Sequence, residues 1–134
     1  MNYLIDTDIC IYILNENNPK LKTRFQEKTQ SRFCVSSITE AELYYGALHS
    51  AKPKSNLEKI ELFLSPLEKI YFDSMAAKHF AYLKEHLVKI GKPIGAPDMF
   101  IAASALAHDL TLISNNEKHF QNIPKLKFEN WNTP

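Results

Sequence analysis

The first eight residues restrict the possible folds more than any other stretch of the chain. Tyr3, Leu4 and Ile5 form an apolar run without polar alternation, which is typical of a strand buried on both faces of a parallel sheet. Asp6 follows directly, and a helical pattern then begins. Open α/β sheets bind their ligands at the carboxyl ends of their strands. The stretch therefore predicts a central strand that delivers Asp6 to a ligand site.

The residues after Asp6 suit the start of a helix that runs to Leu14. We expect either Thr7 or Asp8 to cap it by accepting hydrogen bonds from the free backbone N–H groups of the first turn. Both aspartates could serve only as turn and cap residues. Their function therefore depends on what the rest of the chain places beside them.

Strands and helices alternate along the remaining sequence. Further strands are expected at 32–36, 69–72 and 110–113, with an edge strand at 126–128. Helices are expected at 19–30, 39–50, from 55, from the cap Asp73 to Gly91, and from 97. This alternation in a short chain implies βαβ crossovers, and so an α/β fold with a parallel sheet sandwiched by helices.

Length and composition exclude several classes of protein. The 134 residues suit one domain, 1–134, and 45% hydrophobic with 23% charged residues is ordinary for a globular protein. A formal net charge of +1 means that nucleic acid must be bound by a local basic surface. No apolar run approaches the roughly 20 residues of a membrane span, and no amino-terminal signal is visible. We therefore expect a cytoplasmic protein.

Cysteines and histidines give no sign of a disulfide or zinc site. Cys10 and Cys34 are not in a C-x-x-C pair and have apolar neighbours, so buried free thiols are expected. The five histidines do not cluster at a metal-binding spacing; His79 and His86 are expected at the surface of the long helix.

Acidic and amide residues follow the predicted strands. They are Asp6 after the first strand, Glu40 and Glu42 after the second, Asp98 at the start of the helix opened by Pro97, and Ser114, Asn115, Asn116 and Glu117 after the fourth. The ends of parallel strands share one rim, so these side chains can meet. Clustered carboxylates repel unless a cation neutralises them, and oxygen ligands suit Mg²⁺ or Mn²⁺. Such a site favours phosphodiester hydrolysis.

Each of these residues also has a simpler explanation. Asp98 suits the positive end of a helix dipole, and Asn115–Asn116 is ordinary turn chemistry. Ser37 or Thr39 is expected to cap the helix that carries the two glutamates. Glu42 has apolar neighbours, so it is expected inward, with Glu40 toward solvent.

Four segments together resemble the signatures of PIN-domain ribonucleases. They are LIDTD at 4–8, SSITEAELYYG at 36–46, GAPDMFIAA at 95–103, and LISNN at 112–116 followed by Phe120. The chain is most similar to the VapC toxins of bacterial type II toxin–antitoxin modules, down to the terminal FENW at 128–131. The resemblance implies a three-layer α/β/α sandwich around a central parallel sheet, as a single PIN domain.

The resemblance also implies a Mg²⁺-dependent endoribonuclease, with Mn²⁺ as a substitute and tRNA among its candidate substrates. By their positions in the signatures, Asp6 and Asp98 are the expected metal ligands. Glu42 completes the acidic cluster as a ligand or by orienting the attacking water. Asn116 stands where many PIN proteins have an aspartate, so we expect one firmly bound ion and a second that arrives with substrate.

Neighbouring residues are expected to support these groups. Thr7 and Ser114 are expected to hydrogen-bond the carboxylates. Asp8, where the family often has asparagine, could add an acid to the rim or only cap the helix, and Glu117 stands beside the amide of the fourth signature.

VapC toxins are typically dimers, each inhibited by a cognate antitoxin whose carboxyl-terminal segment covers the acidic groove. The resemblance thus implies a homodimer and a toxin–antitoxin hetero-oligomer, without a membrane partner. Tyr12, Tyr44 and Tyr45 could form an apolar platform for the antitoxin or simply pack in the core.

Two other functions remain open from the sequence. A strand ending in Asp-x-Asp is also a hallmark of haloacid-dehalogenase-type phosphatases, but Cys10 stands where that family has Thr or Val, and no late acidic pair follows. The domain could also be a catalytically inactive RNA- or peptide-binding module. The presence of Asp6, Glu42 and Asp98 argues against that alternative.

Overall fold

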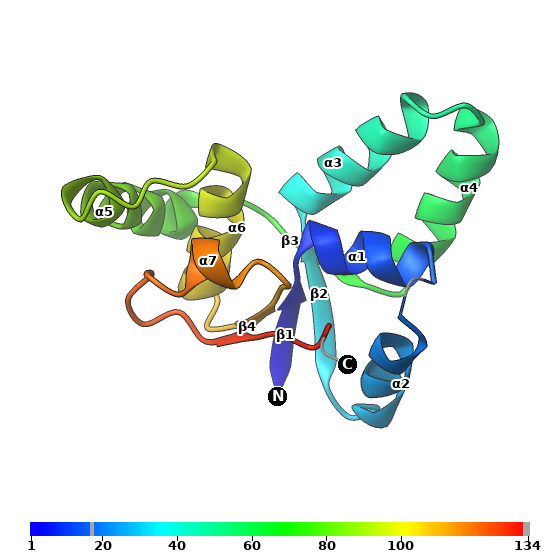
Figure 1. Cartoon of the computed structure of the whole chain (residues 1–134), viewed down its shortest axis with the longest axis horizontal. Helices are drawn as coiled ribbons and strands as arrows, with labels where there is room; N and C mark the ends of the chain where they lie inside the picture. The colour runs from blue at the N-terminus through cyan, green and yellow to red at the C-terminus, as the bar shows by residue number, and fades with distance from the viewer. Residues whose placement is uncertain (17, 133–134) are drawn as a thin grey trace.

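Five parallel strands form the centre of the protein (Figure 1). In this computed structural model, which describes residues 1–16 and 18–132, their order across the sheet is β3-β2-β1-β4-β5. The strands are β1 (Asn2–Ile5), β2 (Arg32–Ser36), β3 (Glu68–Ile70), β4 (Thr111–Ile113) and β5 (Phe128–Glu129). Every neighbouring pair is parallel, so the predicted parallel sheet is confirmed.

Helices cover both faces of this sheet and give the predicted three layers (Figure 1). They are α1 (Thr7–Leu14), α2 (Pro19–Glu27), α3 (Ser37–Leu48), α4 (Pro53–Leu64), α5 (Ser74–Lys89), α6 (Ala96–Ala107) and the short α7 (Glu117–Phe120). Successive strand side chains point to opposite faces. Leu4 therefore packs in a core cluster with α5 and α6, whereas Tyr3 and Ile5 pack in a second cluster with α1 to α4.

The central strand β1 lies where the chain reverses its direction across the sheet. From β1 the chain moves outward to β2 and β3, then returns to place β4 and β5 on the other side of β1. Such a reversal leaves a crevice at the carboxyl ends of the two strands beside it. The Asp6 backbone N–H donates to the Ile113 carbonyl over 2.9 Å, which holds the end of β1 against the end of β4.

An aromatic cluster fixes the carboxyl-terminal segment beneath β1. The Trp131 ring lies 4.9 Å from the Tyr3 ring and 4.8 Å from the Phe25 ring, measured between centroids. Trp131 is 6% exposed, and the Arg24 guanidinium donates to its carbonyl oxygen over 2.7 Å. The end of the chain therefore supports the strand that carries Asp6.

The start of α1 differs from its prediction. Asp6 itself caps the helix, and its carboxylate accepts a hydrogen bond from the Thr7 N–H over 2.8 Å, whereas Thr7 and Asp8 lie inside the first turn. The start of α3 shows the same shift: Ser36 is the cap, in place of the predicted Ser37 or Thr39. In both cases almost no loop separates strand from helix: Asp6 is the single residue between β1 and α1, and Ser36 is the last residue of β2, so the cap lies at the carboxyl end of the strand.

Other boundaries differ by a few residues. Helix α2 ends at Glu27 instead of 30, α4 begins at Pro53 instead of 55, β3 covers 68–70 instead of 69–72, and β5 covers 128–129 instead of 126–128. The cap Asp73, the left-handed Gly91 (φ 69°) and the two free, buried cysteines are confirmed. No helix in the described ranges is long and apolar enough to cross a bilayer.

Candidate active site

Asp6 is 3% exposed at the carboxyl end of β1. One carboxylate oxygen accepts from the Thr7 N–H, and the other accepts from the Ser114 hydroxyl over 2.7 Å. The pKa of Asp6 is raised from 3.8 to about 7: burial is the largest cause and the charge of Asp8 adds to it, while the two hydrogen bonds oppose the shift. Asp6 is therefore held rigidly in an environment that disfavours its charged form.

Asp8 lies two residues after Asp6, in the first turn of α1, at the same rim. Its Oδ2 accepts from the Asn115 backbone N–H over 3.3 Å, but its buried Oδ1 has no hydrogen-bond partner among the described residues. Burial also raises the pKa of Asp8, against the hydrogen bonds from Ile9 and Asn115. A buried carboxylate oxygen without a partner is costly unless a donor or a cation is supplied.

Asp98 reaches this rim from the opposite layer, in the first turn of α6. Its charge raises the pKa of both Asp6 and Asp8, so the three acids share one electrostatic environment. The Asp98 side chain is 22% exposed, and its Oδ2 lies 2.5 Å from Nδ1 of His119. The structure therefore brings Asp6 and Asp98 to one rim, as expected, and adds Asp8.

Glu42 is linked to this group through Thr7. The Thr7 hydroxyl donates to Glu42 Oε1 over 2.7 Å and lies 2.9 Å from the Thr39 hydroxyl, while the Thr7 N–H is bound to Asp6. As expected, Thr7 and Ser114 both hydrogen-bond carboxylates of the site.

The predicted orientations of the two glutamates were wrong. Glu42 is exposed and Glu40 is half-buried. Helix α3 buries Thr39, Leu43 and Ala47. At about 100° of rotation per residue, Glu40 lies about 60° from the centre of that buried face and Glu42 about 100° from it. Glu42 therefore opens toward solvent at the rim instead of toward the core.

The two asparagines that follow β4 lie on different sides of the rim, one near Asp8 and the other near Asp98. The Asn115 side chain lies within hydrogen-bond reach of Tyr12 and Asn130, on the Asp8 side of the rim. The Asn116 side chain lies 2.8 Å from Nδ1 of His119 and so adjoins Asp98 through that ring. Glu117 is exposed and accepts from Asn130.

His119 is a site residue that the sequence analysis missed. The histidines were compared only with one another, whereas the useful spacing is to Asn116, one helical turn earlier. Residues three apart on a helix share a face. The position of Asn116 in the fourth signature could therefore have indicated that His119 lies beside the site.

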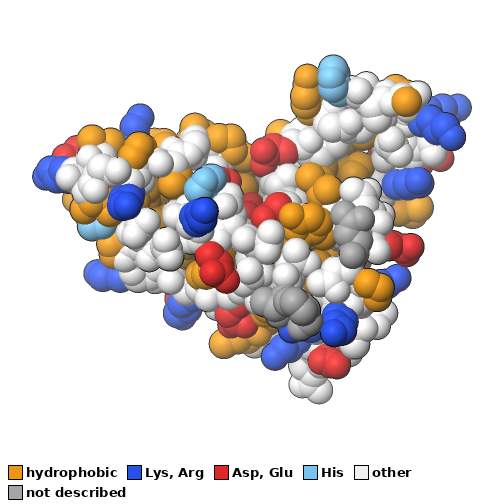
Figure 2. All heavy atoms as spheres, in the orientation of Figure 1, with side chains coloured by type: hydrophobic (Ala, Val, Ile, Leu, Met, Phe, Trp, Pro, Cys, Tyr) orange, Lys and Arg blue, Asp and Glu red, His pale blue; other side chains and the backbone are white. Residues whose placement is uncertain are grey.

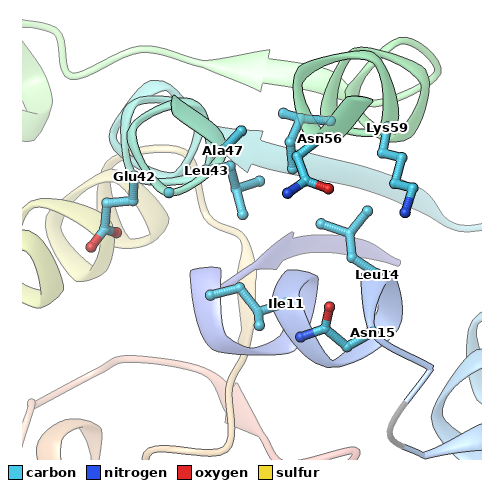
Figure 3. A pocket seen from close by; sticks show the side chains of 10 residues that line it. Ile11, Leu14, Asn15, Glu42, Leu43, Ala47, Asn56 and Lys59 are labelled. Atoms are coloured by element: carbon cyan, nitrogen blue, oxygen red, sulfur yellow. The ribbon is translucent and has the colours of Figure 1, made fainter. Parts of the chain in front are cut away.

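Acidic side chains gather at the base of a hollow between two parts of the molecule (Figure 2). One part is formed by α5, α6 and α7 and the other by α3 and α4, with basic side chains at their outer ends. Beside the hollow, a pocket of about 270 Å³ lies between α1, α3 and α4 (Figure 3). Ile11, Leu14 and Leu43 line it, and Glu42 stands at its edge.

The donor set at this rim suits a hard divalent cation. Within residues 1–16 and 18–132, no three His, Cys, Asp or Glu side chains already converge as a metal-ligand set. Asp98 and Glu42 are instead engaged by His119 and Thr7. The unpartnered Asp8 oxygen and the repulsion within the acid group nevertheless fit a cation, and carboxylate oxygens suit Mg²⁺ or Mn²⁺.

Comparison with known proteins establishes the family. The PIN domain matches residues 3–126. Ribonuclease VapC2 of Haemophilus influenzae is 42% identical over 131 residues, which cover 98% of both chains. The chain belongs to the VapC family of PIN-domain ribonucleases.

Other VapC proteins agree with this assignment. The tRNA(fMet)-specific endonuclease VapC of Salmonella typhimurium is 37% identical over 131 residues, 98% of each chain. The structure of VapBC2 from Rickettsia felis, bound to a promoter DNA fragment, has a TM-score of 0.93 and 36% identity, and the match covers 98% of this chain and 100% of that one.

The α/β/α sandwich and the ribonuclease class predicted from the sequence are confirmed, and the phosphatase alternative is excluded. The PIN-domain nucleases of the VapC family depend on a metal ion.

Proposed function

We propose that this VapC-family ribonuclease is the toxin of a type II toxin–antitoxin module and that it hydrolyses RNA with Mg²⁺ held by Asp6 and Asp98. Mn²⁺ is the expected substitute. The observation that carries the proposal is the group of Asp6, Asp8 and Asp98 at the reversal point of the sheet. One buried carboxylate oxygen of Asp8 has no hydrogen-bond partner among the residues that the structure describes. Both the proposed RNA substrate and the inhibiting antitoxin are cytoplasmic, so we expect the enzyme to work in the cytoplasm.

The chain's own residues have distinct tasks in this mechanism. A bound divalent ion makes water more acidic and neutralises charge that grows on phosphate oxygens. Thr7 and Ser114 fix the Asp6 carboxylate by hydrogen bonds, so its oxygens need no reorganisation to hold the ion. Glu42 is tied to Thr7 and open to solvent, which suits orientation of the attacking water. Asn116 supplies no charge, which favours one firmly bound ion and a second that arrives with substrate.

A structured tRNA is the substrate class that we favour. The support is the similarity to VapC proteins named for cleavage of tRNA(fMet), at 34–37% identity over 98% of this chain. Sequencing of the RNA fragments released after brief induction tests this choice. Fragments that come mainly from messenger RNA would contradict it.

The cognate antitoxin is the proposed partner, in a hetero-oligomer built on a toxin homodimer. The similarity to VapBC complexes supports this partner. The pocket between α1, α3 and α4 offers an apolar surface directly beside Glu42 (Figure 3). Of the three tyrosines considered from the sequence, Tyr45 is 65% exposed, and Tyr12 and Tyr44 are half-buried. An antitoxin segment in this pocket would also cover the acidic rim.

The metal site is tested by titration calorimetry with Mn²⁺. Changing Asp6 or Asp98 to Asn is expected to weaken Mn²⁺ binding, because the ion loses a charged oxygen ligand. A chelator is expected to abolish RNA cleavage by the unmodified protein. Asp109→Asn is the matched control, since Asp109 lies on the surface in a left-handed conformation (φ 52°) that Asn also tolerates. Wild-type Mn²⁺ affinity in both site variants would exclude this metal site.

A local basic surface is expected to bind the RNA backbone, because the net charge is only +1. Lys52 and Lys54 are exposed at the start of α4, and Lys89 and Lys92 are exposed at the end of α5. Changing all four to Ala is expected to weaken RNA binding and to lower the dependence of affinity on salt by close to one unit of slope per lost phosphate contact.

Pairs of lysines provide the control. RNA affinity and its salt dependence are compared between a variant with Lys52 and Lys54 changed to Ala and a variant with Lys20 and Lys22 of α2 changed to Ala. Lys20 and Lys22 are also exposed, so each variant loses two charges. Mn²⁺ binding should remain intact in both. A wild-type salt slope in the four-lysine variant would show that the RNA runs elsewhere.

A further inference from the structure

His119 forms a short contact between α7 and α6 at the rim of the site. Its Nδ1 lies 2.5 Å from Asp98 Oδ2, so a side chain carried by α7 reaches the first turn of α6. The imidazole is 43% exposed and the Asp98 side chain is 22% exposed. The contact occupies one oxygen of Asp98, so Oδ1 remains available to another partner.

The proton on the His119 ring determines which atom donates in this contact. A carboxylate is acceptor-only, so the hydrogen between the two atoms belongs to Nδ1, and the ring donates. Nδ1 then has no lone pair with which to accept from the neighbouring Asn116 amide, 2.8 Å away. The oxygen and nitrogen of an amide have nearly the same shape. The structure places Asn116 Nδ2 at this contact, and exchanging the two amide atoms would let the Asn116 oxygen accept from the Nδ1 hydrogen.

Each of the other acids at the rim is also held by a donor. Asp6 has Thr7 and Ser114, Asp8 has the Asn115 N–H, and Glu42 has the Thr7 hydroxyl. For Asp98, His119 is the corresponding donor among the residues that the structure describes. A carboxylate that is already oriented loses less freedom when it takes a ligand, and such orienting partners are typically worth 10- to 100-fold in metal affinity.

We propose that His119 is a positioning residue: its Nδ1 hydrogen bond fixes the rotation of the Asp98 carboxylate and leaves Oδ1 for the metal ion. This inference rests on the proposed role of Asp98 as a metal ligand. It assigns His119 no contact with the RNA or with the reacting atoms.

The test compares three replacements of His119. His119→Ala is expected to lower Mn²⁺ affinity by about 10- to 100-fold in calorimetry, and to lower kcat with little change in KM for RNA. His119→Asn places an amide donor near the position of Nδ1 and should recover most of the loss. His119→Gln places its amide near the position of Nε2 and should not. Equal Mn²⁺ affinity in the Asn and Gln variants would overturn the proposal.

A second Asp–His pair in the same protein provides the control. His108 Nε2 lies 3.2 Å from Asp73 Oδ2 at the cap of α5, with side-chain exposures of 34% and 46%. His108→Ala removes a similar contact away from the rim, so it should change neither Mn²⁺ affinity nor kcat. Thermal melting of every variant checks that the fold is retained.

A double variant separates this inference from the proposed function. If His119 acts through Asp98, His119→Ala should have no further effect on Mn²⁺ affinity in the Asp98→Asn background. Tighter Mn²⁺ binding by His119→Ala alone would show that His119 competes with the ion for Asp98, and the positioning role would be wrong. Wild-type affinity in Asp98→Asn would instead contradict the metal role of Asp98 itself.

Discussion

Asp6→Asn is expected to slow RNA cleavage by at least about a thousandfold under saturating Mg²⁺, while the protein stays folded. A bound ion supplies several kcal/mol of charge stabilisation in the transition state, and about 4 kcal/mol corresponds to a thousandfold change in rate. The Asn side chain keeps the shape of the cap and can still accept from the Thr7 N–H. Single-turnover cleavage rates provide the measurement.

The same exchange at Asp109 is the control for this experiment. Asp109 is 84% exposed in its side chain and pairs only with Lys127 at the surface, among the described residues. Cleavage by Asp109→Asn should match that of the unmodified protein. A rate within tenfold of wild type in Asp6→Asn would mean that the ion is held elsewhere.

The metal-free protein is expected to lose stability as the pH rises from about 4 to about 7. The pKa of Asp6 is 3.8 in the unfolded chain and about 7 in the folded protein. Between these values the folded protein holds a proton that the unfolded chain has released, so raising the pH favours unfolding. At about 1.4 kcal/mol per unit of pKa, the loss reaches about 4 kcal/mol. The raised pKa of Asp8 acts in the same direction.

Urea unfolding in the presence of a chelator measures this dependence. Asp6→Asn removes the titrating group, so its free energy of unfolding should vary less between pH 4 and 7 than that of the unmodified protein or of Asp109→Asn. Adding Mg²⁺ should restore stability near pH 7, because the ion binds the deprotonated acids. Identical pH profiles for the unmodified protein and Asp6→Asn would contradict the raised pKa.

The fold was predictable because its signals are local. The apolar run before Asp6 indicated a strand buried on both faces, and alternation of strands with helices indicated parallel crossovers. The errors fell at the junctions, where Asp6 directly after β1 and Ser36 at the end of β2 cap the next helix. The strand pattern and the helix pattern each give only an approximate boundary, so they do not show that the cap lies this close to the strand.

The site was predictable only in part because its contacts connect distant residues. The order of the signatures placed Asp6, Asp98 and Asn116 on one rim, but the partners of their side chains depend on tertiary structure. Ser114 reaches Asp6 across 108 residues, and His119 reaches Asp98 across 21. The unpartnered oxygen of Asp8 arises in the same way, because it depends on which donors the neighbouring elements leave unused.

The position of β4 beside β1 has a consequence for the timing of toxicity. Ribosomes make the Asp6 strand first, but Ser114, His119 and Trp131 belong to the last fifth of the chain. Until those residues emerge, β1 lacks one of its two neighbours, Asp6 lacks its second hydrogen bond, and Asp98 lacks its donor. A nascent chain therefore carries Asp6 and Asp98 without the hydrogen-bond donors and the neighbouring strand that hold them in the finished fold. The site therefore has its full set of hydrogen bonds only after Ser114 and His119 have emerged from the ribosome.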